Sequence, residues 1–432
     1  MIPLDTIVAP ATPPGRSALA IVRIDGPLSN TILTALSDTP LPAIRNATRI
    51  YLKDIDDCVA VRYEAPRSFT GNDLVELTLH GNPLLVERVI EECVRLGARM
   101  AEPGEFTERA VLNGKMDLVQ AESIADLINA RTTLQTKLSL SNLEGMLSRK
   151  ASAIRQTLLE VISRLEAALD FSEEGYEFIT RADARSRIAA ALTDVEAMAE
   201  TYRRGRATRA GLSAVILGRP NAGKSTLLNR LVGSDRAIVT PIPGTTRDIV
   251  RETIEIGGLP VTLADTAGLR ESSDVVEGIG IERAREAARS ADLILYLIDA
   301  TAGLTAEDEA ELATLENVQL VFTKADLAPA DGLSISAVSD HGIDELLSRL
   351  DELVRDRYAA SEGALVNERQ RVAVAECASA LRTVLESLDA GYDEQMVLVD
   401  LYRAANSLGL LTGAITRDDV WTEIFGKFCI GK

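Results

Sequence analysis

One stretch of the sequence, Gly218 to Ser225, constrains the fold more than any other. Its residues, Gly-Arg-Pro-Asn-Ala-Gly-Lys-Ser, match the pattern GxxxxGK[ST] in full. The stretch follows a strand-like run, Ser213 to Leu217, and precedes a helix that we expect to begin near Thr226. Glycines at these positions let successive backbone N–H groups point into one concavity at a helix N-terminus, where they bind phosphate. The sequence therefore predicts a phosphate loop in an α/β fold, with a chance glycine-rich turn as the alternative.

Two side chains of this loop have predicted roles in nucleotide chemistry. Lys224 is the cation that reaches the outer phosphates, which gives it a catalytic as well as a binding role. The Ser225 hydroxyl can ligate Mg²⁺. The other nucleotide contacts that we expect from this segment are Asn221, Ala222, Gly223 and Thr226.

Three short motifs follow the loop in the order expected of a GTP-binding domain. In the first motif, Asp265 to Gly268, the aspartate at a strand end can hold Mg²⁺ through water, and the glycine can sense the γ-phosphate. The carboxylate of Asp326 can accept from both the ring N–H and the exocyclic amine of guanine, a pair that adenine cannot supply. Backbone N–H groups near Ser336 can complete the base pocket. The expected contacts are Asp265, Thr266, Ala267, Gly268, Thr323, Lys324, Asp326, Ser336 and Ala337. Each motif alone is weak, but the ordered set favours GTP over ATP.

Two positions depart from the usual pattern of such domains. Thr323 stands where an asparagine is usual, which removes an amide that would buttress the phosphate loop and touch the base. Leu269 stands where Ras-type enzymes place a glutamine that orients water. Since leucine cannot do this, another group must position the water. Glu277, nine residues beyond Gly268, could orient or polarise it, and a solvated surface charge is the alternative.

Oxygen atoms near the phosphate loop could bind a monovalent cation in the place where an arginine finger would otherwise act. Asn221 offers a side-chain oxygen, and the run from Thr240 to Thr246 supplies hydroxyl and carbonyl oxygens of the hard type. Thr246 is the residue that we expect to close over Mg²⁺. These features predict faster hydrolysis in K⁺ than in Na⁺.

The pattern of apolar residues predicts a multidomain chain. Strand-like and helix-like stretches predict a small α+β domain over residues 1–115. Helix-period sequence then runs with few breaks to about Leu169 and returns at residues 182–202, 367–388 and 394–407. Between these helical parts, strands at 213–217, 261–264, 293–298 and 318–322 alternate with helices and predict a parallel sheet. We therefore expect a Ras-like α/β domain, residues 206–365, inserted in a helical domain of residues 116–205 and 366–432. The arginine-rich residues 203–209 read as a solvated linker, with contact to RNA as the alternative.

Composition excludes several classes of protein. The 432 residues carry 46 basic and 65 acidic side chains, a net charge of −19, which argues against a broad nucleic-acid-coating surface but not against a local basic groove. Seven Phe, eight Tyr and one Trp are too few for a binder built on base stacking. Four widely spaced cysteines with two histidines give no zinc signature and no disulfide framework. Without a leader-like or membrane-spanning segment, we expect a cytoplasmic protein.

Features along the whole chain resemble the MnmE (TrmE) family. These are the α/β insertion, Asn221 together with Gly244 to Asp248, the segment Ala101 to Ala110, and the ending Phe428 to Lys432. The resemblance implies a GTPase that works with a flavoprotein partner, MnmG. Together they would build an aminomethyl or carboxymethylaminomethyl group on carbon five of the wobble uridine of certain tRNAs.

The resemblance also implies a homodimer whose GTPase domains meet in the presence of potassium. The matched positions are Asn221, Thr240, Ile242 and Thr245 for potassium, Ser225 and Thr246 for Mg²⁺, and Glu277 for the water.

The family's N-terminal domain binds 5-formyltetrahydrofolate or a related folate. The positions that match its ligand contacts are Arg23, Glu76, Lys115 and Lys432. Glu76 could read the guanine-like edge of a pterin while the cations meet carboxylates. For Arg23 and Glu76 an ordinary ion pair between strands is the alternative. Cys429 is either a reactive thiol near this site or a packed tail cysteine.

Two other classes of function remain open on the sequence alone. A GTP-switched ribosome-assembly factor would share the nucleotide motifs but would carry an RNA-binding domain with a basic surface. A regulatory module that hydrolyses GTP only incidentally would share the motifs as well.

Overall fold

The computed structural model describes residues 5–171, 178–234, 236–238, 251–265, 288–415, 424–426 and 428–431, with the backbone alone at residues 251 and 265. The chain divides into two compact units. The first consists of Met1–Ala125, Ser148–Gln156 and Ala405–Lys432, and the second of Asp126–Leu147 and Thr157–Ala404.

The N-terminal part of the first unit is built on a six-stranded sheet in the order β3-β4-β5-β2-β1-β6. Its strands are β1 (Ile7–Pro10), β2 (Leu19–Asp25), β3 (Thr48–Leu52), β4 (Asp56–Tyr63), β5 (Leu74–His80) and β6 (Arg99–Met100). Neighbouring strands are antiparallel except β1 and β6. Alternate residues such as Val22, Ile24 and Leu77 point to one face, where α1 (Ser29–Leu36) and α2 (Pro83–Arg95) bury them. Helix α3 (Glu105–Leu112) follows β6, and this part confirms the expected α+β fold.

The expected long helical run to Leu169 is in fact three helices: α4 (Leu118–Asn129), α5 (Thr133–Leu143) and α6 (Met146–Asp170). Thr132 begins α5 with a capping box, in which its side chain and that of Gln135 each bond the other's backbone. Gly145 has φ 84°, a left-handed conformation that separates α5 from α6. The breaks therefore come from local capping signals that the apolar period conceals.

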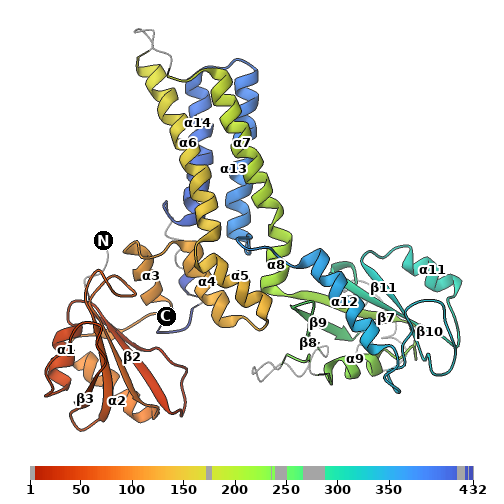
Figure 1. Ribbon diagram of the computed structural model, residues 1–432, viewed down its shortest axis with the longest axis horizontal. Helices are drawn as coiled ribbons and strands as arrows, with labels where there is room; N and C mark the ends of the chain where they lie inside the picture. Colours follow the sequence, from red (N-terminus) through yellow and green to blue (C-terminus); the bar gives the residue numbers. More distant parts are fainter. Residues whose placement is uncertain are drawn as a thin grey trace, which may run out of the picture. The chain divides into compact units, whose positions relative to one another are not determined.

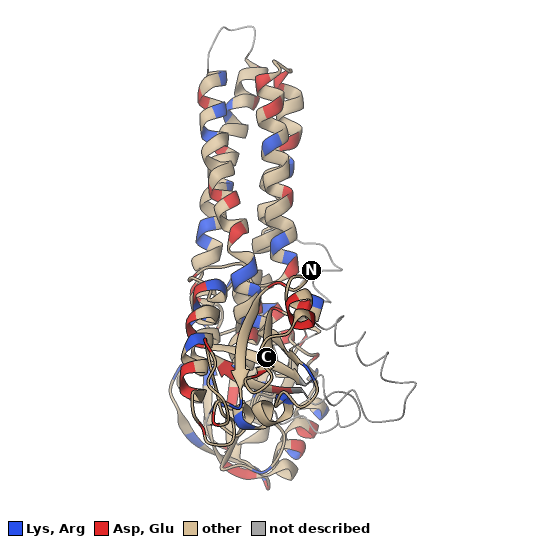
Figure 2. Cartoon of the chain, turned by 90° about the vertical axis from the view of Figure 1, so that its right-hand side faces the viewer, with Lys and Arg blue, Asp and Glu red and all other residues tan. Residues whose placement is uncertain are grey.

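In the second unit, α7 (Arg181–Glu200) packs against α13 (Glu368–Asp389) (Figure 1). Helix α14 (Glu394–Thr412) begins in this unit, and its residues from Ala405 belong to the first. The Nε atom of Arg181 donates to the Leu388 carbonyl at 2.9 Å, so the start of α7 is fixed to the end of α13. Figure 2 shows acidic and basic residues interspersed along the long helices. No helix among the described residues is long and apolar enough to cross a membrane.

The arginine-rich residues 203–209 form a helix, α8 (Tyr202–Ala210), and the expectation of a linker was wrong. The backbone packs too closely for a solvated connection, because a Cβ atom on Gly205 would lie 1.9 Å from the Leu365 carbonyl oxygen. Its arginines have partners within the unit: Arg203 lies over the ring of Tyr358, Arg204 donates to the Asp356 carbonyl, and Arg206 and Arg209 pair with Asp292 and Asp126. These contacts account for the cationic run without RNA.

Replacing Gly205 with alanine is expected to destabilise the protein by about 1–3 kcal/mol or more, because the new methyl group meets backbone that cannot rotate away. Chemical denaturation followed by circular dichroism measures the loss. Arg206→Ala, an exposed change on the same helix, is the control and should unfold close to the wild type. Equal midpoints for Gly205→Ala and wild type would contradict the close approach.

The α/β part of the second unit has a five-stranded sheet in the order β11-β10-β7-β9-β8. Its elements are β7 (Leu212–Gly218), α9 (Lys224–Val232), β8 (Arg251–Ile256), β9 (Leu259–Asp265), β10 (Leu293–Asp299), α11 (Ala306–Leu312), β11 (Val318–Thr323) and α12 (Ile343–Tyr358). Leu227 of α9 and Leu346 and Leu350 of α12 are buried in one core with this sheet. Four strands are parallel, as expected, and place their carboxyl ends at one edge.

Strand β8 was not predicted and makes the sheet mixed. It pairs antiparallel with β9 through a tight turn at Gly257 and Gly258, whose φ angles are 61° and 85°. Two positive φ angles are characteristic of a two-residue hairpin, so the Gly-Gly pair was the available signal.

Candidate functional site

The loop after β7 has the backbone geometry of a phosphate loop. Gly218 has φ 133°, and a Cβ atom there would lie 2.3 Å from the Leu297 carbonyl oxygen of β10. Asn221 and Gly223 also have positive φ angles, 63° and 86°. Helix α9 begins at Lys224, two residues earlier than expected, and thereby directs its first N–H groups at the loop. The Asn221 and Ser225 side chains are exposed.

The Lys224 side chain holds this loop closed. Its Nζ atom donates to the carbonyl oxygens of Gly218 at 2.9 Å and Arg219 at 2.8 Å. Lys224 is 6% exposed, so its cation is largely shielded from water and lies within the loop. A cation in this place can interact with the outer phosphates of a nucleotide.

Thr323 links the phosphate loop to the end of β11. Its hydroxyl lies 2.9 Å from the Ala222 carbonyl oxygen and 3.2 Å from that of Ile298, and its single proton can be donated to one of them at a time. The expectation that threonine leaves the loop without a buttress was therefore wrong. The hydroxyl retains the link to the loop in place of the usual amide.

The two segments expected to bind guanine are joined by backbone hydrogen bonds. The Ala325 N–H donates to the Ile335 carbonyl at 3.0 Å, and the Ile335 N–H donates to Phe322 at 2.7 Å. Lys324 has a left-handed backbone, with φ 58°. Its Nζ atom lies 2.5 Å from Asp299 Oδ2. Hydrogen bonds from the side chains of Lys324 and Thr301 lower the pKa of Asp299.

The Asp326 carboxylate is exposed beside this joint. The expected donor role of Ser336 is not supported, because its N–H donates to the His341 carbonyl at 2.9 Å. A base therefore needs another donor from this loop, and Ala337 follows directly in the chain.

Part of the expected site lies outside the described residues. These positions are Thr240, Ile242, Thr245, Thr246, Thr266, Ala267, Gly268, Glu277 and Lys432. Asp265 is described by its backbone, which ends β9 in register with Ile216 of β7. That register places the start of the Asp-Thr-Ala-Gly motif at the same sheet edge as the phosphate loop.

Two of the residues expected to bind folate are brought together on neighbouring strands. Arg23 of β2 and Glu76 of β5 are register partners, and Arg23 Nε lies 2.8 Å from Glu76 Oε1. The Arg23 guanidinium also lies 5.4 Å from the centre of the Phe69 ring. Burial and the adjacent Glu76 carboxylate raise the pKa of Tyr63. The ion pair between strands, which was the alternative to a folate site, is thus present. It lies beside the aromatic side chains of Phe69 and Tyr63. Lys115 is exposed and donates to the Pro66 carbonyl at 2.9 Å.

A buried ionic cluster near α3 was missed from the sequence. Arg109 is 2% exposed and pairs with Asp25 at 3.0 Å, Asp5 at 2.7 Å and Glu105 at 3.0 Å. Asp25 also accepts hydrogen bonds from the side chains of Thr70 and Asn72. The spacing of Glu105 and Arg109, four residues apart in a helix, was a local signal, but it did not indicate burial.

The C-terminal tail packs closely on the N-terminal part. Gly431 has φ 93°, and a Cβ atom there would lie 1.9 Å from the Pro10 carbonyl oxygen. Burial raises the pKa of Cys58, Cys93 and Cys377 to about 12, which disfavours their thiolates at neutral pH. Cys429 is a free cysteine with an exposed side chain, so it is accessible to reagents in a tail whose backbone is packed.

The mixed sheet, the closed loop after β7 and the joined segments expected to bind guanine define a P-loop GTPase. The family model described as the MnmE helical domain matches residues 118–429, and that described as GTP-binding protein TrmE N-terminus matches residues 6–115. The chain belongs to the MnmE family of tRNA modification GTPases.

Individual relatives match almost from end to end. The tRNA modification GTPase MnmE of Koribacter versatilis is 42% identical over 99% of this chain and 99% of its own. That of Symbiobacterium thermophilum is 41% identical over the same shares. Among solved structures, Aquifex aeolicus Era bound to GDP and aluminium fluoride is 28% identical over 39% of this chain and 66% of its own, with a TM-score of 0.28.

Proposed function

We propose that this chain is a K⁺-stimulated GTPase that modifies carbon five of the wobble uridine of tRNA together with the flavoprotein MnmG. The product is the aminomethyl or carboxymethylaminomethyl form, made with a one-carbon unit from tetrahydrofolate. The phosphate loop closed by Lys224 carries the GTPase part of the proposal. Relatives named tRNA modification GTPase, which match over 99% of their length, support the tRNA part.

Mass analysis of wobble nucleosides tests this function. Cells that lack the chain are expected to lose the modified uridine, and the wild-type gene should restore it where a Lys224→Ala gene does not. Unaltered wobble nucleosides in the deletion strain would reject the proposed function.

The proposed domain division assigns the GTPase to residues 206–365 and the folate and dimer functions to residues 1–115, with helical parts at 116–205 and 366–432. Arg23, Glu76, Lys115 and Lys432 would hold the folate. The Arg23–Glu76 pair beside Phe69 fits such a ligand, because a pterin has both a donor edge and a face that stacks. A cytoplasmic homodimer is part of the proposal, and a monomeric mass in light scattering would remove the dimer.

The proposed cation sites use Ser225 and Thr246 for Mg²⁺, and Asn221, Thr240, Ile242 and Thr245 for K⁺. The left-handed backbone at Asn221 and its exposed side chain suit an oxygen ligand at the rim of the phosphate loop. GTP hydrolysis should be at least about tenfold faster in KCl than in NaCl, because K⁺ would supply the positive charge that an arginine finger supplies in other GTPases. An arginine finger itself raises the rate by far more than tenfold. Initial rates at equal ionic strength measure this, and equal rates in the two salts would falsify the cation site.

Glu277 is proposed to position the attacking water, because Leu269 cannot. Glu277→Ala should lower turnover by a factor on the order of 10²–10⁴, the usual contribution of a positioned acid or base. Nucleotide affinity should stay close to wild type, since the role proposed for Glu277 acts on the water and not on the nucleotide. Single-turnover hydrolysis and fluorescent-GDP titration separate the two quantities. A wild-type rate would return Glu277 to the role of a solvated charge.

A further inference from the structure

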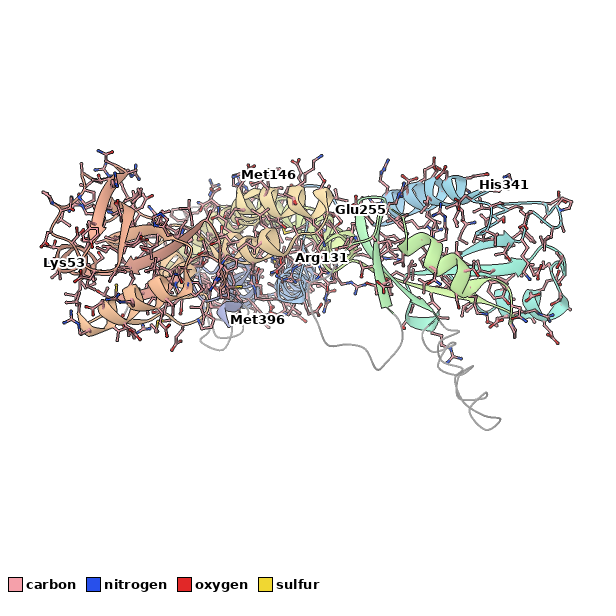
Figure 3. The ribbon with its side chains drawn as sticks, turned by 90° about the horizontal axis from the view of Figure 1, so that it is seen from below. Lys53, Arg131, Met146, Glu255, His341 and Met396 are labelled. Carbon is pink, nitrogen blue, oxygen red and sulfur yellow. The ribbon has the colours of Figure 1, made fainter. Side chains whose placement is uncertain are left out.

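A cleft of about 530 Å³ lies on the second unit, away from the phosphate loop. Its lining includes Arg131 from the loop between α4 and α5, Arg236, Glu255 of β8, Gly257 of the hairpin turn, and Asp351 and Arg355 of α12. Figure 3 labels two of them, Arg131 and Glu255. The cleft therefore joins the helical part of the chain to the sheet of the GTPase part.

One arginine of the cleft has a structural role. Arg236 Nη1 donates to both carboxylate oxygens of Asp351, at 2.9 and 2.8 Å, and the Gly257 N–H donates to the same carboxylate at 2.6 Å. The Arg236–Asp351 pair has no net charge, connects the hairpin to α12 and forms one wall of the cleft. It leaves the guanidinium groups of Arg131 and Arg355 as the positive charges of the cleft.

Arg131 and Arg355 are exposed, and neither forms an ion pair within the described part of the chain. Both guanidinium groups are therefore available to a ligand. A guanidinium presents a fork of N–H donors that matches the oxygens of a phosphate. Two such forks in one cleft indicate a phosphate-bearing ligand.

Glu255 narrows the class of ligand. Its carboxylate, half-buried in the same cleft, would repel a simple anion and requires a donor instead. RNA supplies both partners, because each phosphate of its backbone has a ribose 2′-hydroxyl as a close neighbour. We propose that this cleft binds the sugar–phosphate backbone of tRNA, with Arg131 and Arg355 on phosphate and Glu255 accepting from a 2′-hydroxyl. The inference rests on the proposed function and assigns a place to its substrate.

The salt dependence of tRNA binding tests the two arginines. Binding of a labelled tRNA transcript to the full chain is measured by fluorescence anisotropy over a range of KCl concentrations. The variant Arg131→Gln/Arg355→Gln should bind more weakly, and the slope of log K against log[salt] should decrease in magnitude by about two, roughly one for each phosphate contact. The control is Arg349→Gln, on the same helix but lining a different hollow, and it should keep the wild-type slope. Thermal melts establish that each variant is folded. An unchanged slope in the double variant overturns the proposal.

Glu255 is tested by comparing tRNA with DNA of the same sequence. Wild type should prefer RNA, and Glu255→Ala should reduce that preference severalfold through weaker RNA binding. An unchanged ratio of RNA to DNA affinity in Glu255→Ala overturns the 2′-hydroxyl contact. Displacement of the labelled tRNA by millimolar inorganic phosphate would overturn the RNA assignment and identify a free-phosphate site instead. The wobble-nucleoside measurement keeps this separate from the proposed function. If the deletion strain loses the modification while the slope does not move, only the cleft assignment fails.

Discussion

Arg109→Met should destabilise the N-terminal part by about 3–5 kcal/mol, the usual cost of removing one partner from a buried ion pair. The substitution leaves Asp25, which is fully buried, without its cation. It also removes a partner from Asp5 and Glu105. Urea denaturation followed by circular dichroism measures the loss.

A double-mutant cycle shows whether the charges are the cause. The double variant Asp25→Asn/Arg109→Met should lose less stability than the sum of the losses in the two single variants. The reason is that Asp25→Asn removes the carboxylate that Arg109→Met leaves unpaired. Arg49→Met is the control, since the Arg49 side chain is exposed and its ion pair with Asp57 lies at the surface. Strict additivity would mean that Arg109 does not stabilise the protein through its pair with Asp25.

The same cluster predicts a dependence of stability on pH. Hydrogen bonds and charge from Arg99 and Arg109 outweigh burial and lower the pKa of Asp5 and Glu105, so their contribution is present above the ordinary carboxyl values and is lost as the pH falls below them. Burial raises the pKa of Asp25, so that group acts in the opposite direction. Arg109→Met should flatten the acid limb of the stability profile.

Lys224→Ala should abolish measurable GTP hydrolysis, with a loss in rate on the order of 10²–10³ or greater for one lost charged donor. GTP affinity should fall about 10- to 100-fold, because a hydrogen bond to a charged group contributes roughly 1.5–3 kcal/mol. The loop itself would change as well, since the Lys224 ammonium group also bonds the carbonyls of Gly218 and Arg219. Phosphate release and fluorescent-nucleotide titration measure the two effects.

Lys53→Ala, a surface change in the N-terminal part, is the matched control and should hydrolyse GTP as the wild type does. Lys224→Arg keeps the charge but not the compact ammonium that fits between two carbonyls, so it should not restore activity. Full hydrolysis by Lys224→Ala would remove the phosphate loop from the mechanism.

The sequence was sufficient for the features that have a local cause. The glycines around Gly218 and the apolar runs predicted the phosphate loop, the parallel strands and the expected helices at 182–202 and 367–388. The capped start of α5 at Thr132 could also be read from its own residues, although the continuous apolar period obscured it.

The features that escaped prediction depend on distant partners. Burial of Arg109 arises because β1 and β2 bring Asp5 and Asp25 to it. The substitute buttress at Thr323 depends on the approach of Ala222, which is 101 residues away in the chain. None of these contacts has a periodic or short-range signal, so only the folded chain reveals them.

The close approach of Gly205 to Leu365 has a consequence for how the GTPase part is attached. The chain enters that part through α8 and returns past Leu365, and the two passages touch, with Thr208 bonded to the chain at Ala360 as well. The two connections therefore lie side by side where the chain leaves and re-enters the helical part. A part whose two ends lie close together can be excised, transplanted or circularly permuted with little disturbance to its host.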